Sequence, residues 1–142
     1  MTGTVLEIED IIPHRDRMKL VDEIIELSDD AATTAATATA RWPLYRDGFI
    51  DALVAVELIA QTAAISIGAK RKRESGSGEG RGWIVGIKNA EFKTDRIPVN
   101  SRLITSSRVV LSQDAYSMIE GTVSLGAELI GRVSLQVFRE EY

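Results

Sequence analysis

The chain has 142 residues, of which 44% are hydrophobic and 27% charged, as expected for one soluble domain with a single core. Its formal net charge of −4 gives no electrostatic reason to expect a nucleic acid as partner. Because the sequence has no cysteine and one histidine, disulfides, iron–sulfur sites and thiolate nucleophiles are excluded, and no metal site is predicted.

The first ten residues carry three acidic side chains and no basic segment, so the sequence predicts no secretory signal peptide and a cytoplasmic protein. The most apolar stretch, residues 52–69, is interrupted by Glu57 and by polar side chains. The uncharged run that follows Glu57, Leu58–Ala69, has 12 residues, whereas a membrane-spanning helix needs about 20 apolar residues. No membrane span is therefore predicted.

The predicted elements begin with a helical turn over Ile8–Ile12, which Pro13 ends. Two strands follow. Met18–Leu27 is rich in apolar residues, and Ala32–Arg41 consists mainly of alanine and threonine. A loop is expected over Trp42–Gly48, which contains a proline and an Asp-Gly pair.

The clearest element is a helix from Asp51 to about Lys70. Asp51 is a suitable N-cap, strong helix formers follow it, and the stretch contains no proline. The helix is apolar on nearly all sides, which is typical of a buried helix. At 1.5 Å per residue it would be roughly 30 Å long, the width of a small domain.

The rest of the chain is predicted to form a flexible connection and then strands. Arg71–Gly82 is charged and then rich in glycine and serine. Four strands separated by turn residues follow: Trp83–Phe92, Ser101–Leu111, Ala115–Leu125 and Glu128–Phe138. Consecutive strands with short turns favour an antiparallel sheet. We therefore predict a single α+β domain over residues 1–142, with a sheet that curls around one buried helix.

The one histidine, His14, directly follows Pro13 and precedes the first predicted strand. An isolated histidine is most often a surface loop residue. Imidazole also titrates near neutral pH and can act as a general base, and Pro13 would restrict the backbone that carries it. From the residues alone, both interpretations remain open.

Glu57 lies in the first two turns of the predicted helix between apolar neighbours. It could be a helix-start glutamate that the helix dipole favours, or it could pair with an arginine. A carboxylate in apolar surroundings needs a partner or a raised pKa, and a raised pKa suits a general acid. Gln61, four residues on, shares its helix face and could orient it.

The start of the helix is a further candidate element. Free backbone N–H groups over residues 51–54 could bind a carbonyl oxygen that gains negative charge. A base, an acid and an oxyanion site would suffice to remove a proton beside a thioester carbonyl and expel a β-hydroxyl. The basic run Lys70–Arg73 is either a solvated helix end or a docking patch for an acidic partner.

Two motifs resemble those of hotdog-fold 3-hydroxyacyl-[acyl-carrier-protein] dehydratases. The first is Pro-His-Arg at residues 13–15, followed by Met18–Asp22, and the second is the helix motif Val56–Gln61. His14 and Glu57 are 43 residues apart, with two predicted strands between them. Residues 47–68 look closest to the predicted dehydratase branch linked to aryl-polyene-type biosynthesis.

The resemblance implies a hotdog fold, in which an antiparallel sheet wraps around one long central helix. It implies dehydration of 3-hydroxyacyl thioesters to trans-2-enoyl thioesters, with His14 abstracting the α-proton and Glu57 protonating the leaving hydroxyl. His14 of one subunit would face Glu57 of another, so the working unit would be a homodimer or a higher oligomer. The residues expected to bind substrate are Ala52, Gln61, Leu53 and Phe49, with the Ala52 amide on the thioester oxygen.

The resemblance also implies how the substrate is carried. No cofactor is expected, because a phosphopantetheine arm of an acyl carrier protein or of coenzyme A would deliver the acyl chain to a tunnel beside the helix. The sequence departs from the housekeeping enzymes before the helix. Their Gly-His-Phe-Pro-Gly type loop is replaced by Arg46–Ala52, and Ala52 puts a methyl group where a glycine usually presents the oxyanion amide.

Two other functions fit the same residues. Hotdog thioesterases often use one helix carboxylate to activate water and need no histidine before the first strand. A non-catalytic acyl-thioester-binding module or partner subunit would bind acyl carriers without turnover.

Overall fold

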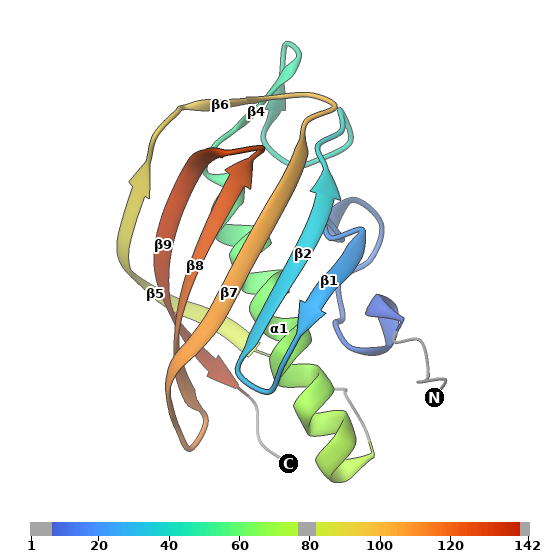
Figure 1. The fold of residues 1–142 in the computed structure, drawn as a ribbon, viewed down its shortest axis with the longest axis vertical. Helices are drawn as coiled ribbons and strands as arrows, with labels where there is room; N and C mark the ends of the chain where they lie inside the picture. Colours follow the sequence, from blue (N-terminus) through green and yellow to red (C-terminus); the bar gives the residue numbers. More distant parts are fainter. Residues whose placement is uncertain (1–6, 77–81, 140–142) are drawn as a thin grey trace.

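The computed structural model describes residues 7–76 and 82–139. A single long helix, α1 (Val54–Ser75), lies along the concave face of a six-stranded antiparallel sheet (Figure 1). The sheet has the order β1-β2-β7-β8-β9-β5 and comprises β1 (Glu23–Leu27), β2 (Ala31–Thr37), β7 (Arg102–Gln113), β8 (Tyr116–Leu125), β9 (Glu128–Arg139) and β5 (Gly82–Phe92).

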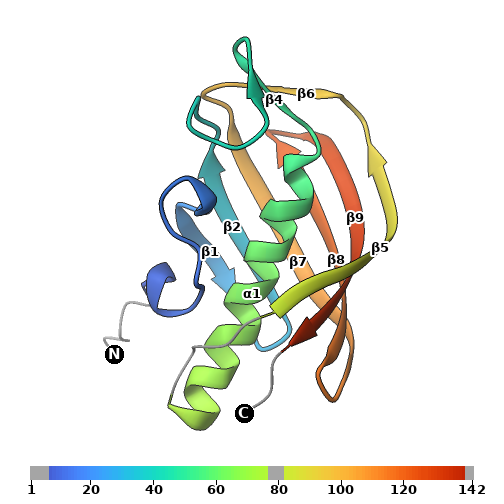
Figure 2. The same cartoon turned by 180° about the vertical axis from the view of Figure 1, so that it is seen from behind.

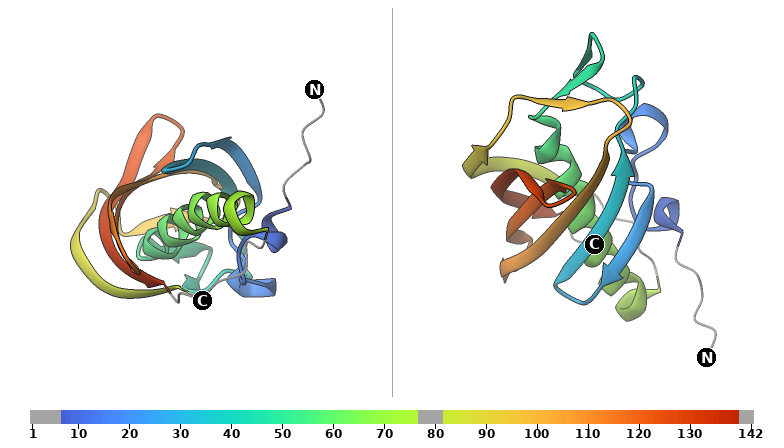
Figure 3. Two further views of the ribbon diagram at one scale, coloured as in Figure 1. Left: turned by 90° about the horizontal axis from the view of Figure 1, so that it is seen from below. Right: turned by 45° about the horizontal axis from the view of Figure 1, so that its top comes forward.

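The sheet curls around the helix, as the view along the helix in Figure 3 shows. Seen from behind, α1 lies in front of the sheet and the N-terminal segment runs beside it (Figure 2). The α+β class and the antiparallel sheet wrapped around one central helix are therefore confirmed. A short three-stranded sheet stands beyond the helix start and comprises β3 (Tyr45–Arg46), β4 (Phe49–Asp51) and β6 (Arg96–Pro98).

The side of α1 that faces the sheet packs closely against β8, because β8 has a glycine at the point of contact. Leu58 and Ile59 have no exposed surface. A Cβ added at Gly121 of β8 would lie 2.5 Å from Cγ2 of Ile59, so only glycine allows this approach. The predicted hairpins are confirmed, since β7 pairs with β8 and β8 pairs with β9.

The bounds of the helix differ from the prediction at both ends. It begins at Val54, because Asp51 belongs to β4, where its Oδ1 accepts a hydrogen bond from the Leu53 N–H at 2.9 Å. It continues to Ser75, beyond Lys70, into the segment predicted to be a flexible connection. It ends where Gly76 adopts φ of 80° and donates its N–H to the Lys72 carbonyl, a common helix end. Residues 77–81 of the predicted connection lie outside the described residues.

The loop predicted over Trp42–Gly48 contains a strand that the prediction missed. Asp47 and Gly48 have φ of 51° and 89°, the conformation of a two-residue hairpin turn, and they join β3 to β4. The strand predicted from Met18 begins later, at Glu23, because a 3-10 turn, η2 (Asp16–Met18), comes first. The helical turn before Pro13 is confirmed as η1 (Ile8–Asp10).

Candidate active site

His14 lies on the segment between η1 and η2, which packs along α1. Ile11 and Ile12 are buried in a small core with Ile65 and Ala69 of the helix. The Arg15 side chain closes the segment by donating to the carbonyls of Ile12 at 2.8 Å and Glu9 at 2.6 Å. The histidine therefore lies on a loop that is fixed to the helix, and its side chain is only partly exposed.

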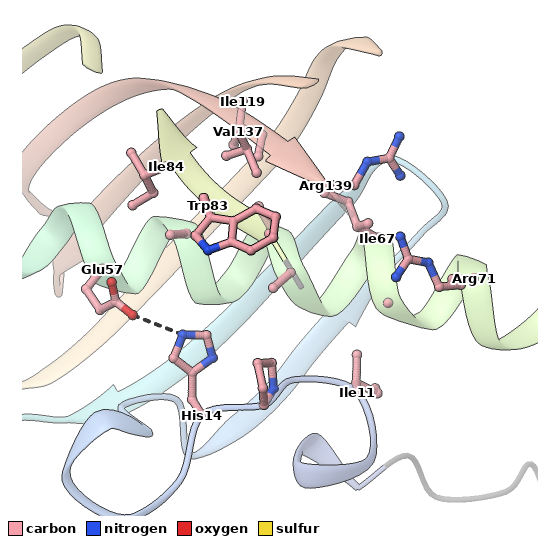
Figure 4. Close-up of a pocket in the computed structure, with 16 residues that line it drawn as sticks. Ile11, His14, Glu57, Ile67, Arg71, Trp83, Ile84, Ile119, Val137 and Arg139 are labelled. Atoms are coloured by element: carbon pink, nitrogen blue, oxygen red, sulfur yellow. Dashed lines mark ion pairs between the residues drawn. The ribbon is translucent and has the colours of Figure 1, made fainter. Parts of the chain in front are cut away.

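His14 and Glu57 meet within one chain. His14 Nε2 lies 3.2 Å from Glu57 Oε1, and 26% and 29% of the two side chains are exposed (Figure 4). The resemblance implied that His14 of one subunit would face Glu57 of another. In this structure the two side chains meet within one chain, because the segment before β1 runs along its own helix beside Glu57 and Gln61.

Gln61 connects the two halves of the pair. Its side chain is fully buried, and its Nε2 donates to Glu57 Oε1 at 3.0 Å and to the Met18 carbonyl at 2.6 Å. Its Oε1 accepts the Leu20 N–H at 3.0 Å. One amide thus fixes the glutamate and ties the histidine segment to the helix, which extends the orienting role expected of it.

The charge state of Glu57 depends on its hydrogen-bond partners. Burial alone would raise the pKa of its carboxyl, but hydrogen bonds from His14 and Gln61, together with the charge of His14, outweigh burial and hold this pKa below its usual range. Of the two alternatives predicted for this carboxylate, a partner or a raised pKa, the structure provides the partner, because His14 and Gln61 both contact it. In this conformation Glu57 is an ionised hydrogen-bond acceptor.

A mainly apolar pocket of about 300 Å³ extends from the pair along the helix. On the helix side it is lined by small residues, among them Ala60, Ala64 and Gly68, and the opposite wall includes Trp83 of β5 and Val137 of β9 (Figure 4). The tunnel beside the helix that the resemblance implied has its counterpart here. A pocket of this size and polarity suits an acyl chain.

The predicted residues at the helix start do not line this pocket. Ala52 is 2% exposed, and its N–H donates to the Asp95 carbonyl at 2.9 Å, so it is not available to a thioester oxygen in this conformation. Leu53 is 55% exposed, and Phe49 lies under the Arg96 guanidinium at the separate small sheet. The oxyanion role expected of Ala52 therefore has no support in this geometry.

The far part of the pocket includes two residues that the sequence did not indicate. Trp83 and Arg139 line it together with Arg71, which was predicted only as part of the basic run Lys70–Arg73. Trp83 and Arg139 lie at the start of β5 and the end of β9, which pair with each other. No spacing rule could have found them, because the strand order that brings them to α1 is not local in sequence.

Comparisons with known proteins place the chain in a family. The family of ApeP-like proteins, described as ApeP dehydratase, matches residues 6–141. The chain belongs to the ApeP-like dehydratase family. As a member of this family, it is a dehydratase-like lyase.

Curated relatives and solved structures agree with this assignment. The ApeP-like chain is 25% identical over 133 residues to the 3-hydroxyacyl-[acyl-carrier-protein] dehydratase FabZ of Streptococcus equi subsp. zooepidemicus, covering 88% of this chain and 89% of the relative. It is also 25% identical over 137 residues to FabZ of Streptococcus thermophilus, covering 91% of this chain and 92% of the relative.

Among solved structures, the dehydratase heterocomplex ApeI:P from Xenorhabdus doucetiae has a chain similar to the ApeP-like chain, with a TM-score of 0.88 at 20% identity. The match covers 97% of this chain and 93% of that one, and it confirms the hotdog fold.

The part of the ApeP-like chain that the structure describes contains no helix with the length and hydrophobicity of a membrane span.

Proposed function

We propose that this chain dehydrates 3-hydroxyacyl thioesters to trans-2-enoyl thioesters, with His14 and Glu57 as the acid–base pair. The observation that carries the proposal is the 3.2 Å contact between His14 Nε2 and Glu57 Oε1 at the polar end of an apolar pocket. The FabZ relatives are named as dehydratases of 3-hydroxyacyl groups, which supports a 3-hydroxyacyl thioester as the substrate.

The chemistry starts with Nε2 of His14 unprotonated and a proton on Glu57. A proton transfer across the contact produces this form from the imidazolium–carboxylate form without exchange with solvent. Exclusion of water by a bound substrate favours it, because both groups are then neutral. Cα and the β-hydroxyl of the substrate would lie against the two side chains, on the pocket side of their contact, while Gln61 holds Glu57 to the helix.

In the elimination, His14 takes up one proton from the substrate and Glu57 gives one proton to it. Nε2 of His14 accepts the α-proton, and the electron pair of the C–H bond forms the double bond between Cα and Cβ. The bond between Cβ and oxygen breaks, and Glu57 gives its proton to the leaving hydroxyl, which departs as water. The product state is the imidazolium–carboxylate pair, and proton transfer back across the contact restores the starting form.

The proposal includes a carried substrate and an oligomer. A phosphopantetheine arm, of an acyl carrier protein or of coenzyme A, would deliver the thioester without a further cofactor. The edge strand β5 exposes large apolar side chains, including Val85 at 59% and Ile87 at 52%. An unpaired apolar edge of this kind favours pairing with a second chain, which fits a homodimer or higher oligomer.

A second function is favoured by one observation. An ionised Glu57 could activate water directly, which is the chemistry of a hotdog thioesterase. The two reactions differ in product, since a thioesterase releases a free thiol and a dehydratase leaves the thioester intact.

The test measures turnover of a 3-hydroxyacyl pantetheine thioester by the wild type and by two single variants. His14→Ala and Glu57→Gln are each expected to lower the dehydration rate about 10²- to 10⁴-fold, the usual contribution of a general acid or base. Glu26→Gln, on the exposed strand β1, is the matched control and keeps wild-type turnover. Thiol release that survives His14→Ala would replace the dehydratase proposal with the thioesterase.

A further inference from the structure

The far end of the pocket is chemically unlike its walls. The pocket runs along α1 from Glu57 to Arg71, which is about 21 Å at 1.5 Å per residue. Between these two residues its walls are apolar, but two guanidinium groups, those of Arg71 and Arg139, stand at its far end (Figure 4). A pocket built only for a hydrocarbon tail would gain nothing from them.

Arg139 is incompletely paired. Its Nη2 donates to Ser112 Oγ at 3.3 Å and to the Asp114 carbonyl at 3.1 Å. Its Nε is buried and has no acceptor among the described residues, which also provide no ion-pair partner for this guanidinium. A partly buried guanidinium without an ion-pair partner is costly, so an acceptor that reaches its remaining N–H groups at the far end of the pocket would be favoured.

The surroundings of Arg139 include acidic residues. A second hollow adjoins the pocket, shares Arg71 and Arg139 with it, and is lined by Asp29, Asp30 and Glu74. Asp29 is already paired with Arg73 of the helix end. Arg71, which belongs to the basic run Lys70–Arg73, therefore lies at the far end of the pocket, about four helical turns from Glu57.

We propose that Arg139 reads the far end of the acyl chain, and that the preferred substrates carry a hydrogen-bond-accepting oxygen there. This inference rests on the proposed function, because it places the thioester at His14 and Glu57. The apolar walls fit the acyl chain better than the phosphopantetheine arm, whose two amide groups would be desolvated among alanine and isoleucine side chains.

Binding of substrate-like thioesters tests the inference separately from catalysis. The probes are saturated acyl thioesters of pantetheine, which lack the 3-hydroxyl and the phosphate. They come in a series of chain lengths, each with a terminal methyl or a terminal hydroxymethyl group. We expect the hydroxymethyl chains to bind on the order of tenfold more tightly, and only at lengths that reach Arg139, since hydrogen bonds to charged groups are strong.

Two variants assign the preference to a residue. Arg139→Met is expected to abolish the advantage of the hydroxymethyl chains and leave the methyl chains unaffected. Arg132→Met, on the exposed side of the same strand, is the matched control and keeps the preference. Circular dichroism melting of both variants shows whether either has lost its fold.

Each outcome decides the inference. Equal binding of both series by the wild type at every length overturns it, whatever the variants do. Weaker binding of all chains in Arg139→Met, without a change in preference, also overturns it and assigns Arg139 to packing. If phosphopantetheine thioesters lose affinity in this variant and pantetheine thioesters do not, Arg139 binds the phosphate and the inference is wrong. Failure of the proposed dehydration leaves these binding results unchanged.

Discussion

The two long sides of α1 differ in packing and in polarity. The side that faces the sheet is packed without space, and there Ile59 lies against Gly121. The side that faces the N-terminal segment carries Glu57 and Gln61 and borders a pocket. One side of the helix therefore stabilises the fold, and the other carries the polar side chains of the candidate site.

Adjacent buried polar residues give the sharpest test of this contrast. Gln61 points to the histidine segment, whereas Thr62 faces the sheet, where its hydroxyl bonds Thr34 of β2 at 2.9 Å. Gln61→Leu is expected to lower the dehydration rate at least tenfold and the free energy of unfolding by about 2 kcal/mol, because Leu20 and Met18 lose their partner. Activity assays and urea denaturation measure both.

The matched variant is Thr62→Val. It is expected to lower the free energy of unfolding by about 1 kcal/mol through the loss of its hydrogen bonds. Its turnover, measured where the variant is fully folded, stays at the wild-type level. If both variants lose the same fraction of activity, the two sides of the helix are not functionally distinct.

The sheet-facing side is tested at Gly121. Gly121→Ala places a Cβ against Ile59 and is expected to lower the free energy of unfolding by about 1–3 kcal/mol, the range for an overpacked core. Gly82→Ala is the control, since its Cβ would meet only ordinary contacts at 3.5 Å. Denaturant titration of both variants checks this, and an unchanged midpoint for Gly121→Ala would show that the helix and sheet can separate at little cost.

The smallest expected effect is the pH dependence of stability. Because hydrogen bonds hold the pKa of Glu57 below its ordinary value of 4.5 in the folded state, its ionised form stabilises the fold above that value. This contribution is lost as the pH falls through the folded-state pKa. Urea denaturation of the wild type and Glu57→Gln should therefore show a difference that shrinks on acidification. A difference that grows toward acid pH would mean a raised pKa.

Much of the fold could be predicted from local pattern. The long run of helix formers after Asp51 indicated α1, and alternating strands with short turns indicated the antiparallel sheet. The hairpin of β3 and β4 was missed because each strand has only two or three residues. The position of the helix start was missed by three residues, because Asp51 is used by a strand that pairs with β6.

The site was predictable in part for the same reason. His14, Glu57 and Gln61 lie in two short motifs, so sequence alone could bring them together. Whether they meet within one chain or across two depends on how the N-terminal segment crosses the helix. Trp83 and Arg139 reach the pocket only through the pairing of β5 with β9, which no local pattern encodes.

The most direct test of the acid–base pair compares the double variant His14→Ala/Glu57→Gln with the two single variants. Residues that act as a unit show non-additive effects, so removal of both should cost little more than removal of either. We predict a dehydration rate for the double variant close to that of the slower single variant. Wild-type turnover of a 3-hydroxyacyl thioester by either single variant would contradict the account.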